Sequence, residues 1–379
     1  MNKNVMIIAG EASGDLHGAQ LVRQVKKLDN EVNFFGIGGS NMKTAGVEIK
    51  IDSAKLAVIG LVEVIKHYRR LVSYLNEMKD LLKTQRPDLV ILIDYPGFNL
   101  RLAKAAKRLK IKVLYYISPQ VWAWRQGRVK KIGLSIDMMA VIFDFETKFY
   151  EDYNIPVRFV GHPLTEEIPE YYNKLEIINS VGLDPNNKIL GLFPGSRKSE
   201  IKNLLPILLE SAKELYQQDE TLQFVLPLAS TINQDDIKPY LKDFQIPVKI
   251  IQDNSTATIQ MCTAIITASG TVTLEIALSG VPMVVIYKIA TLSYFILRMM
   301  VHLDHIALCN IVADKRIVPE LIQNDATPDK IVSEIEKILY YDNYSSTIIE
   351  QLKLIRNNLG RSGKGLLVAE LALEMLGRR

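Results

Sequence analysis

The sequence predicts an α/β protein built from two Rossmann-like, doubly wound domains. Short apolar runs alternate with longer amphipathic segments along most of the 379 residues. The runs are continuous instead of alternating with polar residues, which is typical of strands buried on both faces of a parallel sheet. A chain of this length usually divides into domains of about 100–200 residues, so we expect two such sheets.

The first half supplies six predicted strands with helical patterns between them. The strands are expected at residues 5–9, 32–36, 89–94, 112–117, 138–143 and 157–160. Apolar side chains recur at helical spacing through residues 61–82, which predicts an amphipathic helix. Alternation of strands and helices is typical of parallel sheets covered by helices.

The second half repeats this organisation. Its strands are expected at residues 188–193, 221–227, 248–251, 264–268 and 283–287. The acidic stretch 165–170 and the turn cluster 183–187 mark a boundary, and two further helical patterns fill the tail. We therefore expect an N-terminal domain over 1–165, a C-terminal domain over 166–355, and a closing helix over 356–379.

Composition excludes several classes of protein. The net charge is +4, and no helix–turn–helix, zinc-finger or RNA-binding pattern appears, so no nucleic-acid partner is expected. Only Cys262 and Cys309 are present, which suits a reducing compartment and excludes a disulfide scaffold. Lys288 and Arg298 interrupt the most apolar stretch, so a membrane-spanning helix is not expected there. The expected location is cytoplasmic, and any membrane contact would be peripheral.

Two segments of the first half place polar residues after predicted strands. Small residues fill the loop 10–15, where backbone N–H groups at a helix start could meet a ligand. Ser13 or Asp15 as a helix cap is the alternative there. Asp94 ends a strongly apolar strand, where a partly desolvated carboxylate could accept a proton. The alternative for Asp94 is a turn former ahead of Pro96.

Residues 101–136 contain ten Lys or Arg and no Asp or Glu, and both tryptophans lie in this stretch. Trp122 and Trp124 are followed directly by Arg125. Such a local positive field beside aromatic surface would attract anionic sugars, phosphates or lipid headgroups. A solvated helix face is the alternative.

The second half carries two loops suited to a phosphate. After a predicted strand, Gly195 and Ser196 could offer backbone donors and a hydroxyl, and Arg197 a bidentate cation. The small-residue loop 269–271 offers a second set of backbone donors, and Glu275 could accept both hydroxyls of a ribose. The alternatives are a helix cap at Ser196 or Ser199 and, for Glu275, a first-turn acid favoured by the helix dipole.

Together these loops resemble the lipid-A-disaccharide synthase family over nearly the whole chain. The matching stretches are AGEASGD at 9–15, IDYPGFN at 93–99, SPQVWAWR at 118–125, VGHPL at 160–164, PGSR at 194–197, ASGTVTLE at 268–275 and PELIQ at 319–323. The resemblance implies a GT-B fold, with two Rossmann-like domains facing a cleft and a C-terminal helix returning to the first domain. It implies an inverting, metal-independent hexosyltransferase that makes the lipid A disaccharide of the Gram-negative outer membrane.

The resemblance also assigns residues to roles. Asp94 would be the general base, and Arg197 would stabilise the leaving diphosphate. The donor UDP-sugar, a substrate and not a cofactor, would meet Ser196, Ser269, Gly270, Thr271, Glu275, Asn310, Glu320 and Gln323. The acceptor side would comprise Glu11, Ser13, Gly14, Asp15, Asn99, Trp124 and Arg125. No metal site and no cofactor are expected.

Both substrates implied by the resemblance carry acyl chains, so we expect contact with the anionic inner membrane. Val58, Ile59 and Leu61 belong to an apolar run, and Arg69 and Arg70 follow it. An apolar insertion flanked by cations fits a membrane surface, and a core helix with a solvated rim is the alternative. The sequence leaves acyl-chain length and homo-oligomerisation open.

Two other functions compete with this interpretation. A UDP-sugar 2-epimerase would share the fold and the UDP loops but would bind no lipid. A two-lobed solute-binding protein would lack catalysis, and such proteins are usually exported behind a signal segment, which we do not find here.

Overall fold

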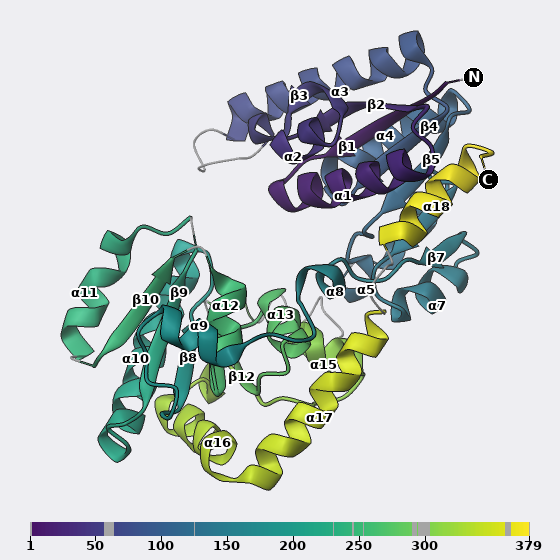
Figure 1. Ribbon diagram of the computed structural model, residues 1–379. Helices are drawn as coiled ribbons and strands as arrows, with labels where there is room; N and C mark the ends of the chain where they lie inside the picture. The colour runs from purple at the N-terminus through teal and green to yellow at the C-terminus, as the bar shows by residue number, and fades with distance from the viewer. Residues whose placement is uncertain are drawn as a thin grey trace. The chain divides into compact units, whose positions relative to one another are not determined.

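The computed structural model describes residues 2–56, 64–124, 126–229, 231–244, 246–252, 254–289, 294, 304–360 and 365–378. The chain forms two compact units, each built on its own parallel sheet (Figure 1). Unit 1 comprises Met1–Pro163 with Gly360–Arg379, and unit 2 comprises Leu164–Leu359. The first segment of unit 1 ends two residues earlier than the expected boundary. Unit 2 ends four residues later than expected, because helix α17 (Asp342–Asn358) continues and buries Ile355 in unit 2.

The sheet of unit 1 has seven strands in the order β3-β2-β1-β4-β5-β6-β7. Their bounds are β1 Lys3–Ala9, β2 Val32–Gly38, β3 Val47–Asp52, β4 Leu89–Ile93, β5 Lys112–Tyr116, β6 Met138–Val141 and β7 Val157–Phe159. The central strand β4 is buried along its whole length, as its continuous apolar sequence predicts. The edge strand β3 was not expected from the sequence.

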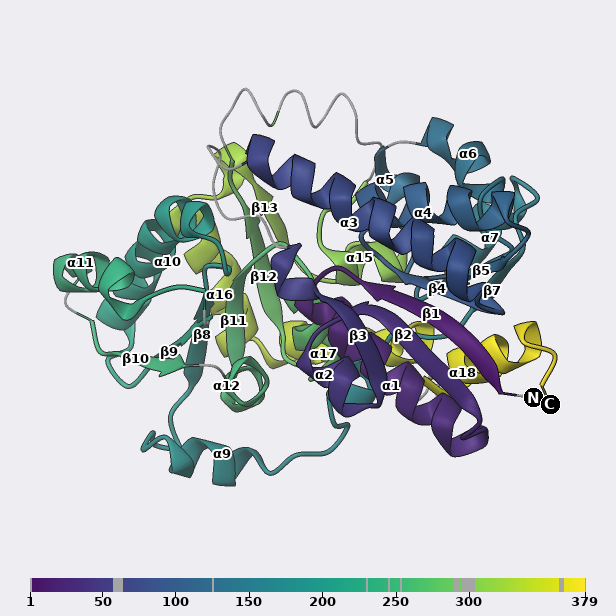
Figure 2. The ribbon, with the colours of Figure 1, turned by 90° about the horizontal axis from the view of Figure 1, so that it is seen from above.

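Helices cover both faces of this sheet (Figure 2). One face buries its apolar side chains beneath α3 Val64–Gln85, α4 Pro96–Arg108, α6 Val129–Gly133 and α7 Phe145–Glu151. On the other face, α1 Ala12–Leu28 packs against α18 Gly365–Met375. The short helices α2 Ser40–Thr44 and α5 Val121–Trp124 and the 3₁₀ turns η1 Ser53–Lys55 and η2 Gln126–Arg128 complete the unit.

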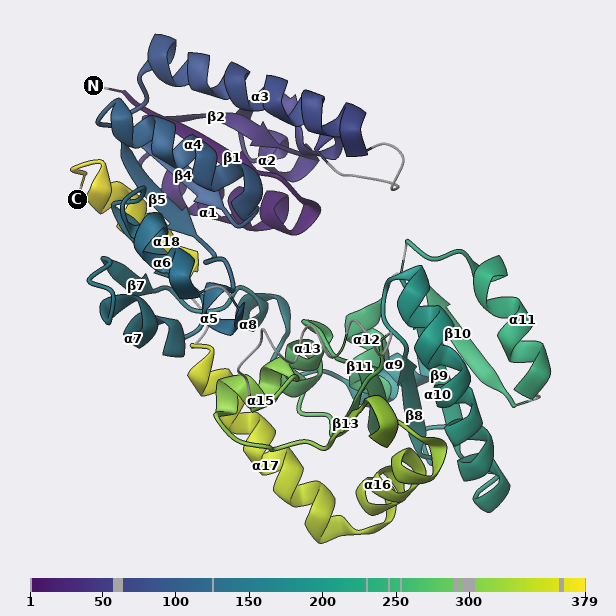
Figure 3. The same ribbon diagram turned by 180° about the vertical axis from the view of Figure 1, so that it is seen from behind.

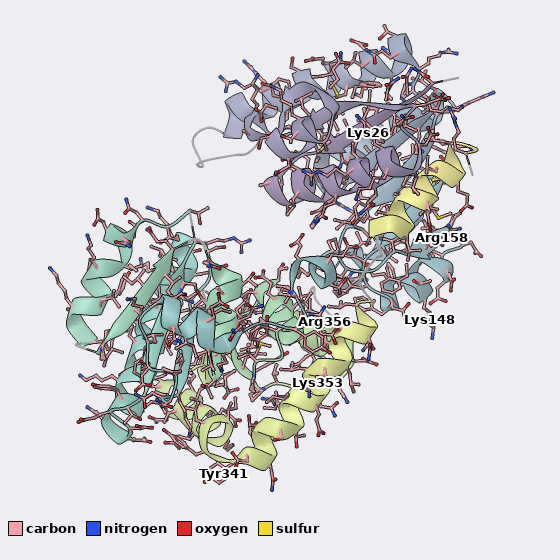
Figure 4. All side chains as sticks on the ribbon, in the orientation of Figure 1. Lys26, Lys148, Arg158, Tyr341, Lys353 and Arg356 are labelled. Atoms are coloured by element: carbon pink, nitrogen blue, oxygen red, sulfur yellow. The ribbon has the colours of Figure 1, made fainter. Side chains whose placement is uncertain are left out.

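Helix α18 brings the end of the chain back to unit 1. The Lys112 Nζ atom donates to the Met375 carbonyl at 2.7 Å. Arg158, labelled beside α18 in Figure 4, forms a 2.8 Å ion pair with Glu374. These contacts attach the helix to β5 and β7, so the chain returns to its first unit as the resemblance implies.

The sheet of unit 2 has six strands in the order β10-β9-β8-β11-β12-β13 (Figure 2). The strands are β8 Ile189–Phe193, β9 Gln223–Leu228, β10 Val248–Gln252, β11 Ala264–Ala268, β12 Met283–Tyr287 and β13 Glu320–Ile322. The helices are α8 Leu164–Glu167, α9 Lys174–Ser180, α10 Lys198–Gln218, α11 Gln234–Phe244, α12 Ser255–Met261, α13 Val272–Leu278, α15 Leu308–Ala313, α16 Pro328–Tyr340 and α17, with the 3₁₀ turn η3 Gln323–Asp325. Figure 3 shows the same unit from behind, with α10, α16 and α17 among its helices.

The strand order of each sheet reverses direction at one point. In unit 1 this point lies between β1 and β4, where Ala9 pairs with Ile93. In unit 2 it lies between β8 and β11, where Phe193 pairs with Thr267. Ligands of open α/β sheets bind at the carboxyl ends of the strands at such a reversal. The loops 10–15 and 94–99 in one unit, and 194–197 and 269–271 in the other, leave from these points.

Candidate active site

Asp94 lies in a strained turn directly after β4. Asp94 and Tyr95 have φ values of 43° and 47°, a left-handed conformation that costs free energy for residues other than glycine. The Asn99 side-chain amide holds this turn by donating to the carbonyls of Ile93 at 3.1 Å and Asp94 at 2.7 Å. The Tyr115 hydroxyl donates to the same Asp94 carbonyl at 2.6 Å. The fold therefore fixes the backbone that carries the carboxylate.

The environment of Asp94 suits proton transfer near neutral pH. Burial, with a smaller contribution from the Glu11 carboxylate, raises the pKa of Asp94 to about 6. Glu11 is the exposed N-cap residue of α1, at the end of the neighbouring strand β1. A carboxyl group with this pKa is ionised at pH 7 yet accepts a proton more readily than an ordinary aspartate.

The loop before α1 and the first turn of this helix contain exposed residues and one carboxylate that is fully hydrogen-bonded within the protein. Ser13 is exposed, whereas Gly14 and Asp15 are buried. The Asp15 carboxylate accepts hydrogen bonds from the backbone amides of Gly39 at 2.6 Å, Asn41 at 3.0 Å and Met42 at 3.1 Å. It thus caps helix α2. Because its oxygen atoms are occupied, a positioning role suits Asp15 better than contact with an acceptor.

A buried carboxylate organises the tryptophan segment. Glu146 accepts hydrogen bonds from the Ser118 hydroxyl at 2.6 Å, the Trp122 indole N–H at 3.0 Å and the Phe143 amide at 3.2 Å. Burial raises the pKa of Glu146 to about 7. Trp122 therefore serves the fold of this segment. The Trp124 backbone ends α5, and its side chain, like the whole of Arg125, lies outside the described residues.

A pocket of about 570 Å³ lies at the reversal point of unit 2. Its walls come from the carboxyl ends of β8, β9 and β11 and from the loops that follow them. The residues predicted from the sequence that line it are Ser196, Arg197, Ser269, Gly270, Thr271 and Glu275. The fold thus brings two loops about 70 residues apart in sequence into one pocket, and both carry groups suited to a phosphate.

Arg197 and the carboxylate of Glu200 form a close pair in this pocket. The Arg197 guanidinium donates to Glu200 Oε1 at 2.9 Å, and the amides of Ser196 and Arg197 donate to Oε2 at 2.9 and 3.1 Å. Gly195 permits this approach, because it has a φ of +103° and an added Cβ would lie 2.2 Å from Oε2. Of the backbone donors that the sequence suggests for a phosphate, the Ser196 amide is therefore occupied by Glu200.

The loop 269–271, the second loop of the pocket, has backbone amides that are available to a ligand. Within the described ranges, the amides of Gly270 and Thr271 donate to no other residue. The Ser269 hydroxyl donates to the Ile306 carbonyl at 2.8 Å and so ties the loop to a neighbouring segment. Burial, with a smaller contribution from Glu167, raises the pKa of Glu275, whose Oε2 lies 3.5 Å from the Ser255 hydroxyl.

Comparison with known proteins decides the family. A model of the lipid-A-disaccharide synthetase family matches residues 5–361. The lipid-A-disaccharide synthase of Geobacter metallireducens is 50% identical over 378 residues, which span 100% of this chain and 98% of that protein. This chain belongs to the lipid-A-disaccharide synthetase family. The synthase of Nitrosococcus oceani is 51% identical over 98% of this chain and 96% of its own, and that of Coxiella burnetii is 44% identical over 99% of both. The chain is therefore a glycosyltransferase of lipid A biosynthesis.

Solved structures show the same GT-B architecture at low sequence identity. A UDP-N-acetylglucosamine 2-epimerase from Neisseria meningitidis, bound to UDP-N-acetylglucosamine, has a TM-score of 0.66 at 14% identity and covers 98% of this chain and 100% of its own. The calicheamicin glycosyltransferase CalG4 has a TM-score of 0.63 at 13% identity, with 99% and 98% covered. At such identities the likeness shows the fold alone. The epimerases therefore share the fold of this chain, which belongs to the lipid-A-disaccharide synthetase family.

Three residues assigned to the donor by family resemblance have side chains that support loops. Asn310 is fully buried, donates to Val318 and Glu320, and accepts from the amides of Ile317 and Val318. Glu320 in turn accepts from the amides of Ile306 and Ala307. Gln323 forms two hydrogen bonds with the backbone of Ile289. These contacts favour a positioning role for all three side chains.

Sequence reasoning missed several residues of the donor pocket. Glu200, Asn254 and Ser255 line it but were not singled out. Glu200 stands three residues after the Arg197 cap position, the spacing of a capping box, but Arg197 is not the Ser, Thr, Asp or Asn that marks such a box in a sequence.

The remaining expectations concern metals and the membrane. Among the described residues, no group of three or more His, Cys, Asp or Glu could hold a metal ion. No described helix combines the length and the apolar character needed to cross a bilayer. Val58, Ile59 and Leu61 lie outside the described residues, while Arg69 and Arg70 are exposed at the start of α3.

Proposed function

We propose that this chain transfers the sugar of UDP-2,3-diacylglucosamine to the 6-hydroxyl of 2,3-diacylglucosamine 1-phosphate. The products are the β-1′,6-linked disaccharide 1-phosphate and UDP. Unit 1 holds the acceptor and unit 2 the UDP-sugar. The environment of Asp94 carries this proposal, because inverting transfer needs one base on the attacking oxygen and the pKa of Asp94 is raised to about 6.

Each bond change is assigned to a part of this chain. The acceptor oxygen bonds to C1 of the donor sugar while its proton passes to the Asp94 carboxylate. The bond between C1 and the diphosphate breaks, and its electron pair leaves with UDP. Arg197 and the amides of Gly270 and Thr271 stabilise the departing charge, in keeping with their place in the pocket of unit 2. Glu275 accepts the ribose hydroxyls.

The same proposal includes peripheral contact with the anionic inner membrane. The acylated substrates expected from family membership reside in a bilayer. Val58, Ile59 and Leu61 insert into its surface, and Arg69 and Arg70 contact anionic headgroups, which suits the exposure of the two arginines.

Incubation with both acylated sugars tests the function directly. We expect mass analysis to find the disaccharide 1-phosphate and one UDP for each disaccharide formed, and no UDP when the acceptor is left out. Release of UDP, or conversion of the donor sugar to its 2-epimer, without any acceptor would instead favour the epimerase alternative.

A further inference from the structure

A groove lies between α3 and α4 and begins beside the turn that carries Asp94. These helices run side by side over one face of the unit 1 sheet (Figures 1 and 2). Its first part is a pocket of about 270 Å³, lined by Leu71, Leu75, Tyr95, Gly97, Phe98 and Arg101. Five of these six residues carry no charge. The pocket therefore offers mainly apolar surface within one residue of the proposed catalytic carboxylate.

The second part of the groove is strongly basic. A pocket of about 370 Å³ adjoins the first, since Leu75 and Arg101 line both. Its charged lining residues are Lys79, Arg101, Lys104 and Arg108, and no acid lines it. Among the described residues these four cations form no ion pair, whereas Lys107 on a neighbouring face of α4 pairs with Asp137. Four unpaired cations along one groove create a field that favours an anion.

The spacing of the lining residues places the apolar and the basic parts of the groove along one side of α4. On α4, Gly97, Arg101, Lys104 and Arg108 recur at intervals of three and four residues, which puts them on one side of the helix. Arg101 follows Gly97 by one helical turn, a rise of about 6 Å. An apolar chain beside Gly97 and an anionic group at Arg101 are thus within reach of one small ligand.

We propose that this groove binds the acceptor, with one acyl chain in the Leu71–Leu75–Phe98 pocket and its phosphate on the cations led by Arg101. The inference deepens the proposed function and rests on it. A sugar whose hydroxyl reaches Asp94 lies next to Tyr95, where the apolar pocket begins. The groove thereby selects an acceptor that carries both a chain and a phosphate.

Gly97 provides a substitution that fills the pocket without disturbing the fold. A Cβ added there meets no atom within 4 Å, and Gly97 occupies an ordinary helical position in α4. Gly97→Leu therefore places its side chain in space that is otherwise open, and Gly97→Ala is the matched control of smaller size. For the anion, Arg101→Gln removes an exposed cation, and Arg23→Gln removes one from α1 on the opposite face of the sheet.

Calorimetric titration with alkyl phosphates as probes tests the site without turnover. We expect dodecyl phosphate to bind the parent at least tenfold more tightly than hexyl phosphate or inorganic phosphate, because only the long chain fills the apolar pocket. Gly97→Leu should abolish this preference and Gly97→Ala should keep it. Arg101→Gln should weaken both alkyl phosphates about tenfold, while Arg23→Gln should not.

Two results would overturn the inference. Binding of dodecyl phosphate to Gly97→Leu as tightly as to the parent would show that no chain occupies the pocket. Equal affinity of the parent for inorganic phosphate and dodecyl phosphate would reduce the site to an anion patch. The proposed function fails separately, if the parent makes no disaccharide from the two acylated sugars while it still binds dodecyl phosphate.

Discussion

At Asp94, one residue combines a strained backbone with a raised pKa. Its carbonyl accepts hydrogen bonds from Asn99 and Tyr115, and its carboxylate is partly desolvated near Glu11. Strained conformations of this kind persist where surrounding contacts determine them fully, and they cluster at functional sites. The sequence could predict a polar residue at the end of an apolar strand, but the left-handed turn and its supports, Asn99 and Tyr115, become visible only in the folded chain.

The pH dependence of activity follows from this environment. A base must be ionised, so kcat/KM should fall as the pH drops below about 6, where the Asp94 carboxyl takes up its proton. Glu11→Gln removes a like charge and should lower the pKa of Asp94, which moves this limb to lower pH. Glu48→Gln, an exposed acid on β3, is the control. If the acidic limb of the kcat/KM profile stays at the same pH in Glu11→Gln, the result would contradict coupling between the carboxylates of Glu11 and Asp94.

Arg197 provides a second prediction at the residue scale. Arg197→Ala should weaken UDP binding at least tenfold and lower kcat, because a charge-assisted hydrogen bond to the diphosphate is lost. The Arg197 side chain is 79% exposed, so its loss should alter stability little. Arg197→Lys should restore UDP binding only poorly, since the single charge of an ammonium group cannot replace the two parallel hydrogen bonds of a planar guanidinium. Lys198→Ala, next along the chain, is the control, and unchanged UDP affinity in Arg197→Ala would refute the assignment.

Among the elements, continuous apolar runs located most strands, and the edge strands β7 and β10 were also predicted, whereas the edge strands β3 and β13 escaped prediction. Strand β3 carries Glu48, Lys50 and Asp52 among its six residues, so it lacks the apolar run of a central strand. Strand β13 has only three residues, too few for a periodic pattern. The apolar run is clearest in central strands such as β4, which is buried along its whole length.

The roles of side chains at loop ends were also only partly predictable from the sequence. The sequence pattern for Asp15 and the family resemblance for Asn310 suggest a place near ligand-binding loops. The contacts of both side chains with backbone amides become visible only in the folded chain. The pocket of unit 2 shows the converse. Its two loops were recognised separately, and their meeting in one pocket follows from strand order.

Helix α2 offers a test of the role of Asp15. Asp15→Ala leaves three backbone amides of the segment 39–42 without their acceptor, and the side chain is only 4% exposed. The free energy of unfolding should fall by about 3 kcal/mol. Ser13→Ala, an exposed residue in the same helical turn, should change it by less than about 0.5 kcal/mol. Denaturant unfolding measures both variants, and equal stability of the two would contradict the capping role.

For the whole molecule, the proposed reaction divides the chemistry between the two units. Unit 1 supplies Asp94 and the groove between α3 and α4, and unit 2 supplies the pocket with Arg197 and the loop 269–271. The composition shows no sign of membrane attachment on its own, because the net charge is only +4. The prediction of membrane contact rests on the local pattern of an apolar run followed by cations.

Membrane binding should respond to the apolar run at every salt concentration. Replacing Val58, Ile59 and Leu61 by Ser should reduce binding to anionic vesicles, since burial contributes about 25 cal/mol per Å² of apolar surface. High salt should weaken only the contribution of the cations. The control replaces three exposed leucines elsewhere, Leu28, Leu175 and Leu354, by Ser. A folded triple variant that sediments with vesicles like the parent would refute the contact.

The substitution Asp94→Asn tests most directly whether Asp94 is the base of the transfer reaction. Asparagine has the same shape and tolerates the left-handed backbone at this position, so the fold should survive. With UDP affinity and thermal unfolding like those of the parent, we expect kcat for disaccharide formation to fall by about 10²–10⁴. A folded Asp94→Asn variant with near-parental kcat would contradict the account.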